Sequence, residues 1–449
     1  MNTLLPGILN TGFYQMLDAT GSGQMVWTID SGRLPNGVTL SPSGLISGKP
    51  TESGPFNVTI RATNDVGFDV RAFAMSVFAG TSIVNPSLPF ALTGTAYNAT
   101  LEAHGEGPFT WAVTTGSLPN GLVLNTGTGV ISGTATADGR STFTITATGV
   151  LDSASASFTI DVYTLPQITT ANLGHGVLTE NFNVKLTATG TQPMTFTHTG
   201  GSLPYGVVLA SDGTLSGTPT GTGNFTFTIT VTNAGGSTSR EYTVGVFQKP
   251  TLTFVSFDDA VVGILYTRTL TAIGSPTITY AVTEGQLPAG LNLNTATGVI
   301  TGTPTTSELR TFTITATNAY GSDAKQYTIF VGQRPAFITD TLGFTIRGQQ
   351  AEYQLEATGT APITYAITGG ELPPGLQLTT TGVIGGASST DGEYTFNVTA
   401  TNAYGFIEKQ FKIFVFSRPV ITTSPTLPNA VLGQDYNVQL RAAGTMGND

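Results

Sequence analysis

The chain has 449 residues, and its hydrophobic fraction of 39% is sufficient for a packed core, which excludes a disordered protein. Its 27 acidic and 17 basic residues give a net charge of −10 without a run of either sign, so the basic stripe of a nucleic-acid-binding protein is absent. The lack of cysteine excludes disulfides, thiolate zinc sites and cysteine nucleophiles, and no apolar run reaches the roughly 18–20 residues that cross a bilayer.

One short motif, Leu-Pro-x-Gly followed by Leu or Val, recurs along the chain, and its leucines are 84, 85, 84 and 85 residues apart. The leucine, proline and glycine of the five copies are Leu34, Pro35 and Gly37; Leu118, Pro119 and Gly121; Leu203, Pro204 and Gly206; Leu287, Pro288 and Gly290; Leu372, Pro373 and Gly375. Such regularity predicts tandem copies of one folding unit, and the period suits a small β-sandwich better than a solenoid repeat of roughly 20–50 residues.

Prolines between apolar strands set the domain boundaries. The predicted domains are 1–79, 80–163, 164–247, 248–331 and 332–416, and 417–449 form the first two strands of an incomplete sixth domain. The N-terminus lacks the basic and apolar regions of a secretory signal, so we expect synthesis in a cytoplasm. Because only two or three residues separate one domain from the next, we expect a semi-rigid rod.

Period-two alternation of apolar residues predicts seven strands and no helix in each domain. In the fourth domain they are expected at 252–256, 265–273, 277–283, 291–294, 299–302, 310–317 and 324–331. The fold class is therefore all-β, a tandem array of immunoglobulin-like seven-stranded sandwiches.

An aromatic residue recurs in the third strand of every domain, and we expect it to be the central ring of each core. These residues are Trp27, Trp111, Phe196, Tyr280 and Tyr365. In the sixth strand, apolar residues such as Phe312 and Ile314 alternate with threonine. This alternation predicts one buried face and one solvent-exposed face.

The final 33 residues contain counterparts of the first two strands only, and two strands cannot bury a core. We expect either that the natural protein continues past Asp449, which is the preferred interpretation, or that another chain completes this segment by strand addition.

The motif Gly-x-Leu-Pro-x-Gly-Leu, continued by Thr-Gly-x-Ile-x-Gly-Thr-Pro-Thr and then Thr-Phe-Thr-Ile-Thr-Ala-Thr-Asn-Ala-Tyr-Gly, carries a family resemblance. It resembles the immunoglobulin-like (cadherin-like, He_PIG-type) repeats of bacteriophage virion proteins and large bacterial surface proteins. The resemblance covers essentially the whole chain and implies the sandwich fold. It implies spacer, adhesion or virion-decoration roles alike, so it is not specific for one function.

Cadherin-like repeats suggest calcium between domains, which requires clustered carboxylate oxygens. Asp258 and Asp259 are the only adjacent acidic pair, and the other domains carry no equivalent. We therefore expect no cofactor and no interdomain calcium. The histidines His104, His175 and His198 occupy non-equivalent positions, and no Ser/His/Asp, Glu/Glu or His/Glu arrangement repeats, so we expect no enzyme.

Two turn-borne aromatic residues, Tyr320 and Tyr404, are candidate surface contacts to sugars or proteins. The alternative is that each ring packs at a domain junction and stiffens the rod.

The hypothesis from sequence is a non-enzymatic structural protein of a bacteriophage virion, in its tail, fibre or capsid decoration. Its partners would be other virion proteins or further copies of itself, with weak contacts to glycans or proteins of the host surface. The alternatives are a segment of a bacterial cell-surface adhesin and an accessory binding module of a secreted hydrolase.

Overall fold

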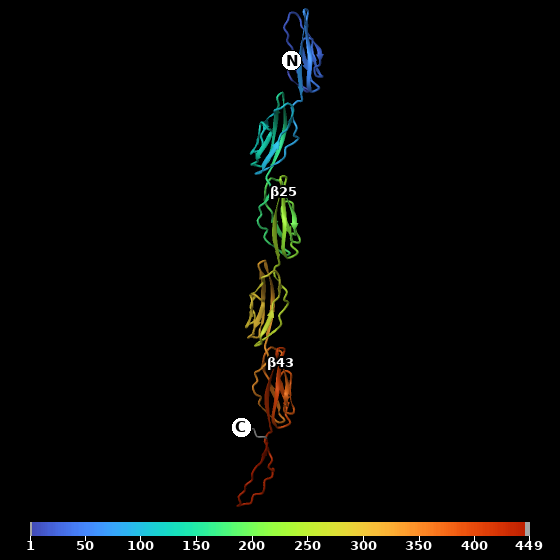
Figure 1. Cartoon of the computed structure of the whole chain (residues 1–449). Coiled ribbons are helices and arrows are strands. Elements are labelled where there is room, and N and C mark those ends of the chain that lie inside the picture. Colours follow the sequence, from blue (N-terminus) through green and yellow to red (C-terminus); the bar gives the residue numbers. More distant parts are fainter. Residues whose placement is uncertain (1, 445–449) are drawn as a thin grey trace. The chain divides into compact units, whose positions relative to one another are not determined.

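The structure, a computed structural model, describes residues 2–444 (Figure 1). Every regular element in these residues is a β-strand, which confirms the all-β prediction. The chain divides into two compact units, Met1–Val246 with domains 1 to 3 and Phe247–Asp449 with domains 4 and 5 and a final segment. Within residues 2–444 there is no helix that could span a membrane.

The strands of the first unit follow the predicted repeat. Domain 1 contains β1 (Asn2–Thr3), β2 (Gly7–Ile8), β3 (Phe13–Met16), β4 (Val26–Gly32), β5 (Val38–Leu40), β6 (Leu45–Gly48), β7 (Gly54–Asn64) and β8 (Gly67–Phe78). Domain 2 contains β9 (Ser82–Ile83), β10 (Ala91–Leu92), β11 (Ala96–Thr100), β12 (Ala103–His104), β13 (Thr110–Gly116), β14 (Leu122–Leu124), β15 (Val130–Thr134), β16 (Gly139–Thr148) and β17 (Ser153–Tyr163). Domain 3 contains β18 (Gln167–Ile168), β19 (Gly176–Val177), β20 (Phe182–Lys185), β21 (Ala188–Thr189), β22 (Thr195–Gly201), β23 (Val207–Leu209), β24 (Thr214–Gly217), β25 (Gly223–Asn233) and β26 (Gly236–Phe247).

The second unit repeats the same order. Domain 4 contains β27 (Thr251–Leu252), β28 (Ala260–Val261), β29 (Tyr266–Thr269), β30 (Ala272–Ile273), β31 (Thr279–Gly285), β32 (Leu291–Leu293), β33 (Val299–Gly302), β34 (Leu309–Asn318) and β35 (Gly321–Gly332). Domain 5 contains β36 (Ala336–Phe337), β37 (Phe344–Ile346), β38 (Gln350–Gln354), β39 (Ala357–Thr358), β40 (Thr364–Gly370), β41 (Leu376–Leu378), β42 (Val383–Ala387), β43 (Gly392–Asn402) and β44 (Gly405–Phe416). The final segment contains β45 (Val420–Ile421) and β46 (Ala442–Ala443).

Domain 4 illustrates the sheet topology. Strands β28, β35, β34 and β31 form a four-stranded sheet in that order, and β29, β33 and β32 form a three-stranded sheet. β27 and β30 make a short antiparallel pair of their own. The long strands β25 and β43, labelled in Figure 1, are the counterparts of β34 in domains 3 and 5.

Six of the seven strands predicted in domain 4 are present, whereas the first, expected at 252–256, is a strand only at its start, in β27. β27 pairs with β30, and β28, which lies outside the predicted range, runs parallel to β35 in the other sheet. The second predicted strand divides between β29 and β30 at Leu270, whose amide donates to the Gly298 oxygen at 2.9 Å instead of to a neighbouring strand. Period-two alternation does not reveal this break, because the apolar side chains face one core on both sides of it.

Each domain encloses its own core, and the repeated aromatic ring lies inside it. The five aromatic side chains have exposed fractions of 4–8%. On the sixth strand of domain 4, Phe312 and Ile314 have exposed fractions of 1% and 0%. Burying a side chain of this size stabilises a fold by about 1.5–3 kcal/mol, and the alternation places several such residues in each domain.

Hydroxyl groups cover the outer face of the four-stranded sheets. In domain 3, Thr226 and Thr243 form a cross-strand hydrogen bond of 2.9 Å, and Thr230 and Ser239 form one of 2.7 Å. Cross-strand pairs of this kind contribute roughly 0.2–1 kcal/mol each. They explain how a chain with only 10% charged residues keeps a polar outer surface.

The final segment has the geometry of the start of a domain. β45 and β46 pair antiparallel, and the Tyr436 hydroxyl donates to the Pro428 oxygen at 2.9 Å. Tyr97 and Tyr266 make the same contact eight residues back, at 3.1 Å each. Tyr436 is 46% exposed, whereas Tyr97 and Tyr266 are 7% and 6% exposed. The local fold of a sixth domain therefore forms among the described residues without the core that would bury it.

Candidate functional site: the repeated turn and the domain linkers

The Leu-Pro-x-Gly motif forms the turn between β31 and β32 in domain 4. The Leu291 amide closes it by donating to the Pro288 oxygen at 3.0 Å. Gly290 has φ of 90°, and a Cβ on it would lie 2.1 Å from the Thr303 oxygen. A Cβ on Gly302, in the facing strand, would lie 2.0 Å from the Gly290 oxygen. The two backbones approach so closely that only glycine fits.

The same geometry recurs in the other domains. A Cβ on the motif glycine would lie 2.0–2.2 Å from a backbone oxygen in each case, at Gly37, Gly121, Gly206 and Gly375. The motif prolines Pro35, Pro119, Pro204, Pro288 and Pro373 are buried. The motif leucines Leu34, Leu118, Leu203, Leu287 and Leu372 pack against the five cores. The motif residues therefore hold the fold.

The second turn of each repeat covers the core aromatic ring. In domain 4, the Asn294 side-chain oxygen accepts from the amides of Ala296 and Thr297 at 3.0 and 3.1 Å. Gly298 follows with φ of 72°, and a Cβ on it would lie 3.0 Å from the Tyr280 ring. This glycine therefore lets the turn lie flat on the ring.

Domain 3 has a charged version of this second turn. Its Asp212 carboxylate binds the Lys185 ammonium at 2.6 Å and accepts from the Thr214 amide at 2.9 Å. The hydrogen bond from Lys185, followed by that from the Thr214 amide, lowers the pKa of Asp212 to about 2. The resulting contribution to stability is present above the unfolded pKa of about 3.9 and is lost as the pH falls through about 2.

Replacing Lys185 with methionine is expected to raise the pKa of Asp212 above 2, because the larger cause of the shift is removed. The value should stay below the ordinary value of about 3.9, because the Thr214 amide still donates. NMR titration of the Asp212 carboxyl carbon measures this shift, and an unchanged pKa would show that Lys185 does not hold the carboxylate.

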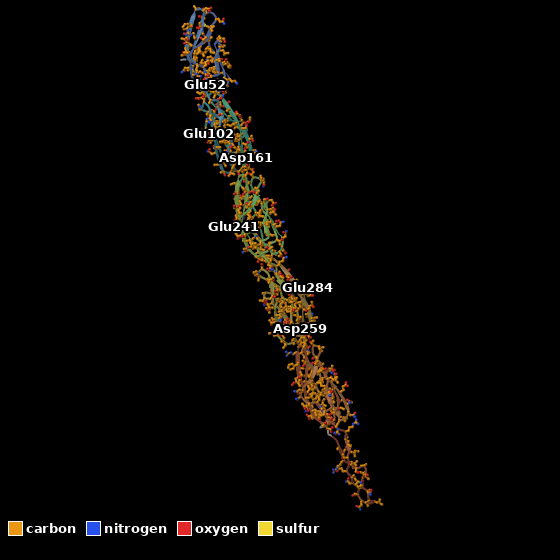
Figure 2. The ribbon with its side chains drawn as sticks, turned by 90° about the vertical axis from the view of Figure 1, so that its right-hand side faces the viewer. Glu52, Glu102, Asp161, Glu241, Asp259 and Glu284 are labelled. Carbon is orange, nitrogen blue, oxygen red and sulfur yellow. The ribbon has the colours of Figure 1, made fainter. Side chains whose placement is uncertain are left out.

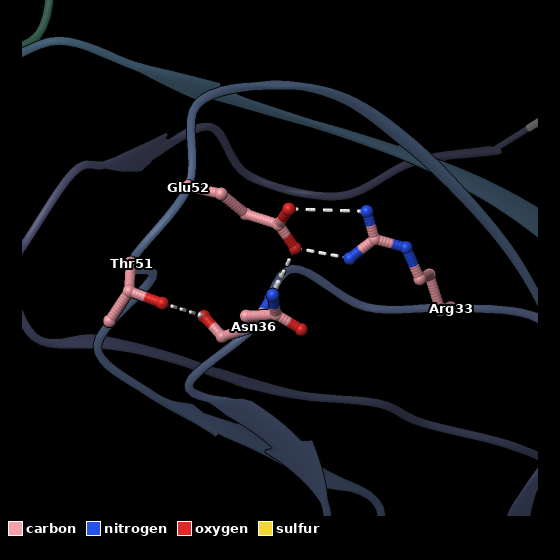
Figure 3. A network of polar contacts seen from close by, with 4 residues as sticks. All are labelled: Arg33, Asn36, Thr51 and Glu52. Carbon is pink, nitrogen blue, oxygen red and sulfur yellow. Dashed lines mark hydrogen bonds and ion pairs between the residues drawn. The ribbon is translucent and has the colours of Figure 1, made fainter.

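In domain 1 the first turn is braced by a carboxylate from the following loop (Figure 3). Glu52 accepts from the Asn36 amide at 2.7 Å and makes a two-pronged contact with Arg33. The Thr51 hydroxyl donates to the Asn36 oxygen at 3.4 Å. The contact with Arg33 lowers the pKa of Glu52, so the group is an ionised brace rather than a proton donor. Glu308 accepts from the amide of the equivalent residue, Ala289, at 3.0 Å in domain 4.

The acidic groups are dispersed and do not gather into a site. Figure 2 labels carboxylates that come from four different domains, namely Glu52, Glu102, Asp161, Glu241, Asp259 and Glu284. Asp258 binds Arg268 of its own domain. His198 lies exposed on the edge strand β22, and its ring nitrogen contacts the Gly200 oxygen at 2.8 Å. Over residues 2–444, no three His, Cys, Asp or Glu side chains are placed to hold a metal ion.

Asn318, at the end of β34, anchors the linker that enters domain 4. Its side-chain amide donates to the oxygens of Gln248 and Ser275, both at 2.8 Å, and its side-chain oxygen accepts from the Tyr320 amide at 2.9 Å. Asn318 is only 8% exposed, so all three bonds are shielded from water. We call this asparagine the linker clamp.

The linker clamp recurs in domains 3 and 5. Asn233 donates to the oxygens of Thr164 and Thr191 at 2.8 and 3.0 Å, and Asn402 donates to those of Gln333 and Thr360 at 2.8 Å each. Domain 2 has Gly149 at this position, and there Asp152 accepts from the Thr81 amide at 3.1 Å instead. Sequence reasoning missed the role of this asparagine. The recurrence of a polar residue at the repeat spacing was the available signal.

The two candidate tyrosines flank the linker clamp. The Tyr404 ring lies 5.8 Å from that of Phe330 and covers Gly332, where a Cβ would be 2.4 Å from it. Its hydroxyl donates to the Asp259 carboxylate at 2.7 Å, which raises the pKa of Tyr404. Tyr320 stacks on Phe247 with ring centroids 4.1 Å apart. Both rings are partly buried, so other residues of the second unit cover much of their surface.

Replacing Asn318 with alanine is expected to destabilise domain 4 by about 2 kcal/mol, because two buried carbonyl oxygens and one amide lose their partner. Asn292 to alanine is the control, since Asn292 is exposed on β32 of the same domain. Hydrogen exchange of domain 4 peptides measures both variants. If the amides of domain 4 were equally protected from exchange in the two variants, the linker clamp would have no structural role.

The comparisons with known proteins point to one domain family. The He_PIG family, described as "Putative Ig domain", matches residues 7–77, 80–163, 165–247, 246–332 and 335–416. A comparison with curated proteins finds no match.

Solved structures of tandem Ig domains also align with the chain. A titin I-band fragment aligns at 18% identity over 56% of this chain and 98% of its own, with a TM-score of 0.42. The N-terminal eight Ig domains of Down Syndrome Cell Adhesion Molecule align at 15% identity over 92% and 71%, with a TM-score of 0.40. Immunoglobulin domains 1–5 of Sidekick-1 align at 15% identity over 92% and 97%, with a TM-score of 0.30. Alignments this weak carry no argument about function. The five family matches cover most of the sequence, and the chain therefore belongs to the He_PIG family of Ig-like domains.

Proposed function

We propose that the protein is a non-enzymatic structural component of a bacteriophage virion, belonging to its tail, fibre or capsid decoration. Its tandem domains act as a semi-rigid rod that makes weak contacts with glycans or proteins of the host surface. The observation that carries the proposal is the linker clamp, which ties the incoming linker to the domain that follows it. Such a contact at successive linkers restricts their motion, as a semi-rigid spacer requires.

The contacts of the acidic side chains in the repeats support a structural, non-catalytic role. Glu52 and Glu308 brace turns, Asp212 closes a hairpin turn, and Asp152 holds a linker. Each of these carboxylates accepts a hydrogen bond from a backbone amide and so holds a turn or a linker in place.

Calcium is not part of the proposal, because the adjacent acidic pair already has other partners. Asp258 binds Arg268, and Asp259 accepts from Tyr404. We therefore expect that adding EDTA to the purified chain leaves its thermal unfolding unchanged. A fall in the unfolding temperature that calcium restores would contradict this expectation.

Mass spectrometry of purified phage particles, combined with negative-stain imaging, tests the virion role. The protein should be found in particles at a fixed ratio to the capsid protein, and antibodies to it should label one part of the particle. A protein found only in the bacterial cell wall would overturn the proposal in favour of the adhesin. A polypeptide found joined to a hydrolase domain would favour the accessory module.

A further inference from the structure

The first strands of domains 2 to 5 are attached to their second strands by the same backbone hydrogen bond. The donating amides are those of Val84, Thr169, Thr253 and Ile338, and the accepting oxygens are those of Glu102, Thr187, Thr271 and Glu356, at 2.8–2.9 Å. We call the segments around the four amides the entry straps, namely residues 80–85, 165–170, 249–254 and 334–339. Because this bond is the same in every strap, it reports on how the rest of each strap is held.

In domain 4, three side chains of the last strand, β35, also hold the entry strap. Asp323 accepts from the Leu252 amide at 2.7 Å. Lys325 and Tyr327 both donate to the Phe254 oxygen, at 2.9 and 3.1 Å. Because the three side chains occupy alternate positions of β35, they point to one face of the strand and form a row of bonds along the strap.

The last strand also binds the entry strap in domains 3 and 5, with other residues of the row. In domain 3, the Tyr242 hydroxyl donates to the Thr170 oxygen at 2.7 Å. In domain 5, the Lys409 ammonium donates to the Thr339 oxygen at 2.9 Å. Both acceptors occupy the position of the strap oxygen that accepts twice in domain 4. In these three domains, therefore, the strap is bound to the four-stranded sheet as well as to the second strand.

Domain 2 has a different sequence at the three positions of the row. Its last strand, β17, carries Ala154, Ala156 and Phe158 there, whose side chains have no polar atom. The strap is tied to the second strand instead, through Asn85, whose side chain donates to the Thr100 oxygen at 3.1 Å and accepts from an amide two residues further on at 2.7 Å. The carboxylate that replaces the linker clamp reaches only the start of the strap. The row therefore cannot bind the domain 2 strap to its four-stranded sheet.

Beyond each strap the chain crosses to the four-stranded sheet and runs parallel to the last strand. The parallel partners include Ala91 and Val162 in domain 2, and Ala260 and Val331 in domain 4. The chain enters at one end of this parallel pair and leaves at the other, so tension along the chain loads its hydrogen bonds together and does not break them one after another. The strap lies between the incoming linker and this pair, so tension reaches the strap first.

We propose that the entry straps are releasable, and that tension along the chain opens the strap of domain 2 before those of domains 3, 4 and 5. In domain 2, Asn85 joins the strap to a second strand whose end, β12, is only two residues long. In domain 4, the row joins the strap to β35, which is 12 residues long and lies inside the four-stranded sheet. Release of residues 80–90 lengthens the chain by at most about 40 Å while the parallel pair keeps the core of domain 2 closed. The inference concerns the response to tension and does not depend on a location in a virion.

Hydrogen exchange of the full chain, resolved to single amides, compares the entry straps at rest. After correction for sequence, the Val84 amide should exchange at least about tenfold faster than the Thr253 amide, because no row binds its strap. The double variant Asp323→Ala/Lys325→Ala copies the row of domain 2 and should speed exchange of the Thr253 amide by at least about fivefold. Gln326→Ala is the control, because Gln326 is exposed on the opposite face of β35. Equal exchange of the two straps, or equal effects of the double variant and the control, would overturn the proposal.

Stretching single molecules of the full chain in optical tweezers, through handles on the two ends, measures the response to tension itself. We expect one reversible extension of at most about 40 Å before any domain unfolds, and a second such step in the double variant. Asn85→Ala should lower the force of the first step, because it removes the side chain that ties the domain 2 strap to the second strand. A first event as long as a whole unfolded domain, a first step that Asn85→Ala leaves unchanged, or a double variant without the second step would overturn the proposal.

Discussion

Alanine at Gly290 is expected to destabilise domain 4 by roughly 3–5 kcal/mol. The new Cβ would lie 2.1 Å from the Thr303 oxygen, and Thr303 cannot retreat because it leads directly out of β33. The φ of 90° adds backbone strain for any residue with a side chain. Hydrogen exchange measured peptide by peptide assigns the loss of protection to domain 4, while the cores of domains 1 and 2 should be unaffected.

Gly263 to alanine separates the two causes of that loss. Gly263 also lies in domain 4 and has φ of 78°, but a Cβ on it would meet no atom within 4 Å. This control should therefore cost only about 1–2 kcal/mol, the strain of the left-handed conformation. If the two variants were equally stable, the close approach of Gly290 to Thr303 would not contribute to the loss of stability.

Removing the Phe396 ring is expected to produce the second large effect, a loss of about 3–5 kcal/mol in domain 5 on changing the residue to alanine. Phe396 is 1% exposed and packs against Phe411, with ring centroids 6.5 Å apart. The cavity left behind is enclosed by two sheets that cannot collapse into it. Chemical denaturation followed by hydrogen exchange of domain 5 peptides measures the loss.

Phe406 to alanine is the matched control in the same domain. Phe406 lies on β44 and is 69% exposed, so its removal should change the stability of domain 5 by no more than about 0.5 kcal/mol. If removing the Phe406 ring destabilised domain 5 as much as removing the Phe396 ring, burial in the core would not determine the loss of stability.

The fold was predictable because its determinants are local and repeated five times. The motif glycines are required by close backbone contacts within one hairpin, and alternation on strands such as β34 directly reports which face is buried. The separate strand β28 and the break in the second strand were not predictable. They depend on which sheet each short strand joins, and this choice leaves the alternation of apolar residues unchanged.

The candidate site was predictable only in part. The aromatic residue of the Asn-Ala-Tyr-Gly turn attracted a surface-contact prediction, whereas the asparagine beside it makes the more extensive set of hydrogen bonds. Its two carbonyl partners, on Gln333 and Thr360, lie 69 and 42 residues earlier in the chain, so no local pattern connects them.

The proposed semi-rigid rod depends on linkers that hold successive domains, and nitrogen-15 relaxation of the full chain tests this most directly at the linker between domains 4 and 5. Asn402 and Tyr404 both contact residues of this linker or of domain 4. We expect the amides of the two domains to report one shared rotational correlation time, and we expect Asn402→Ala to separate the two values. Independent tumbling of the two domains in the unmodified protein would contradict it.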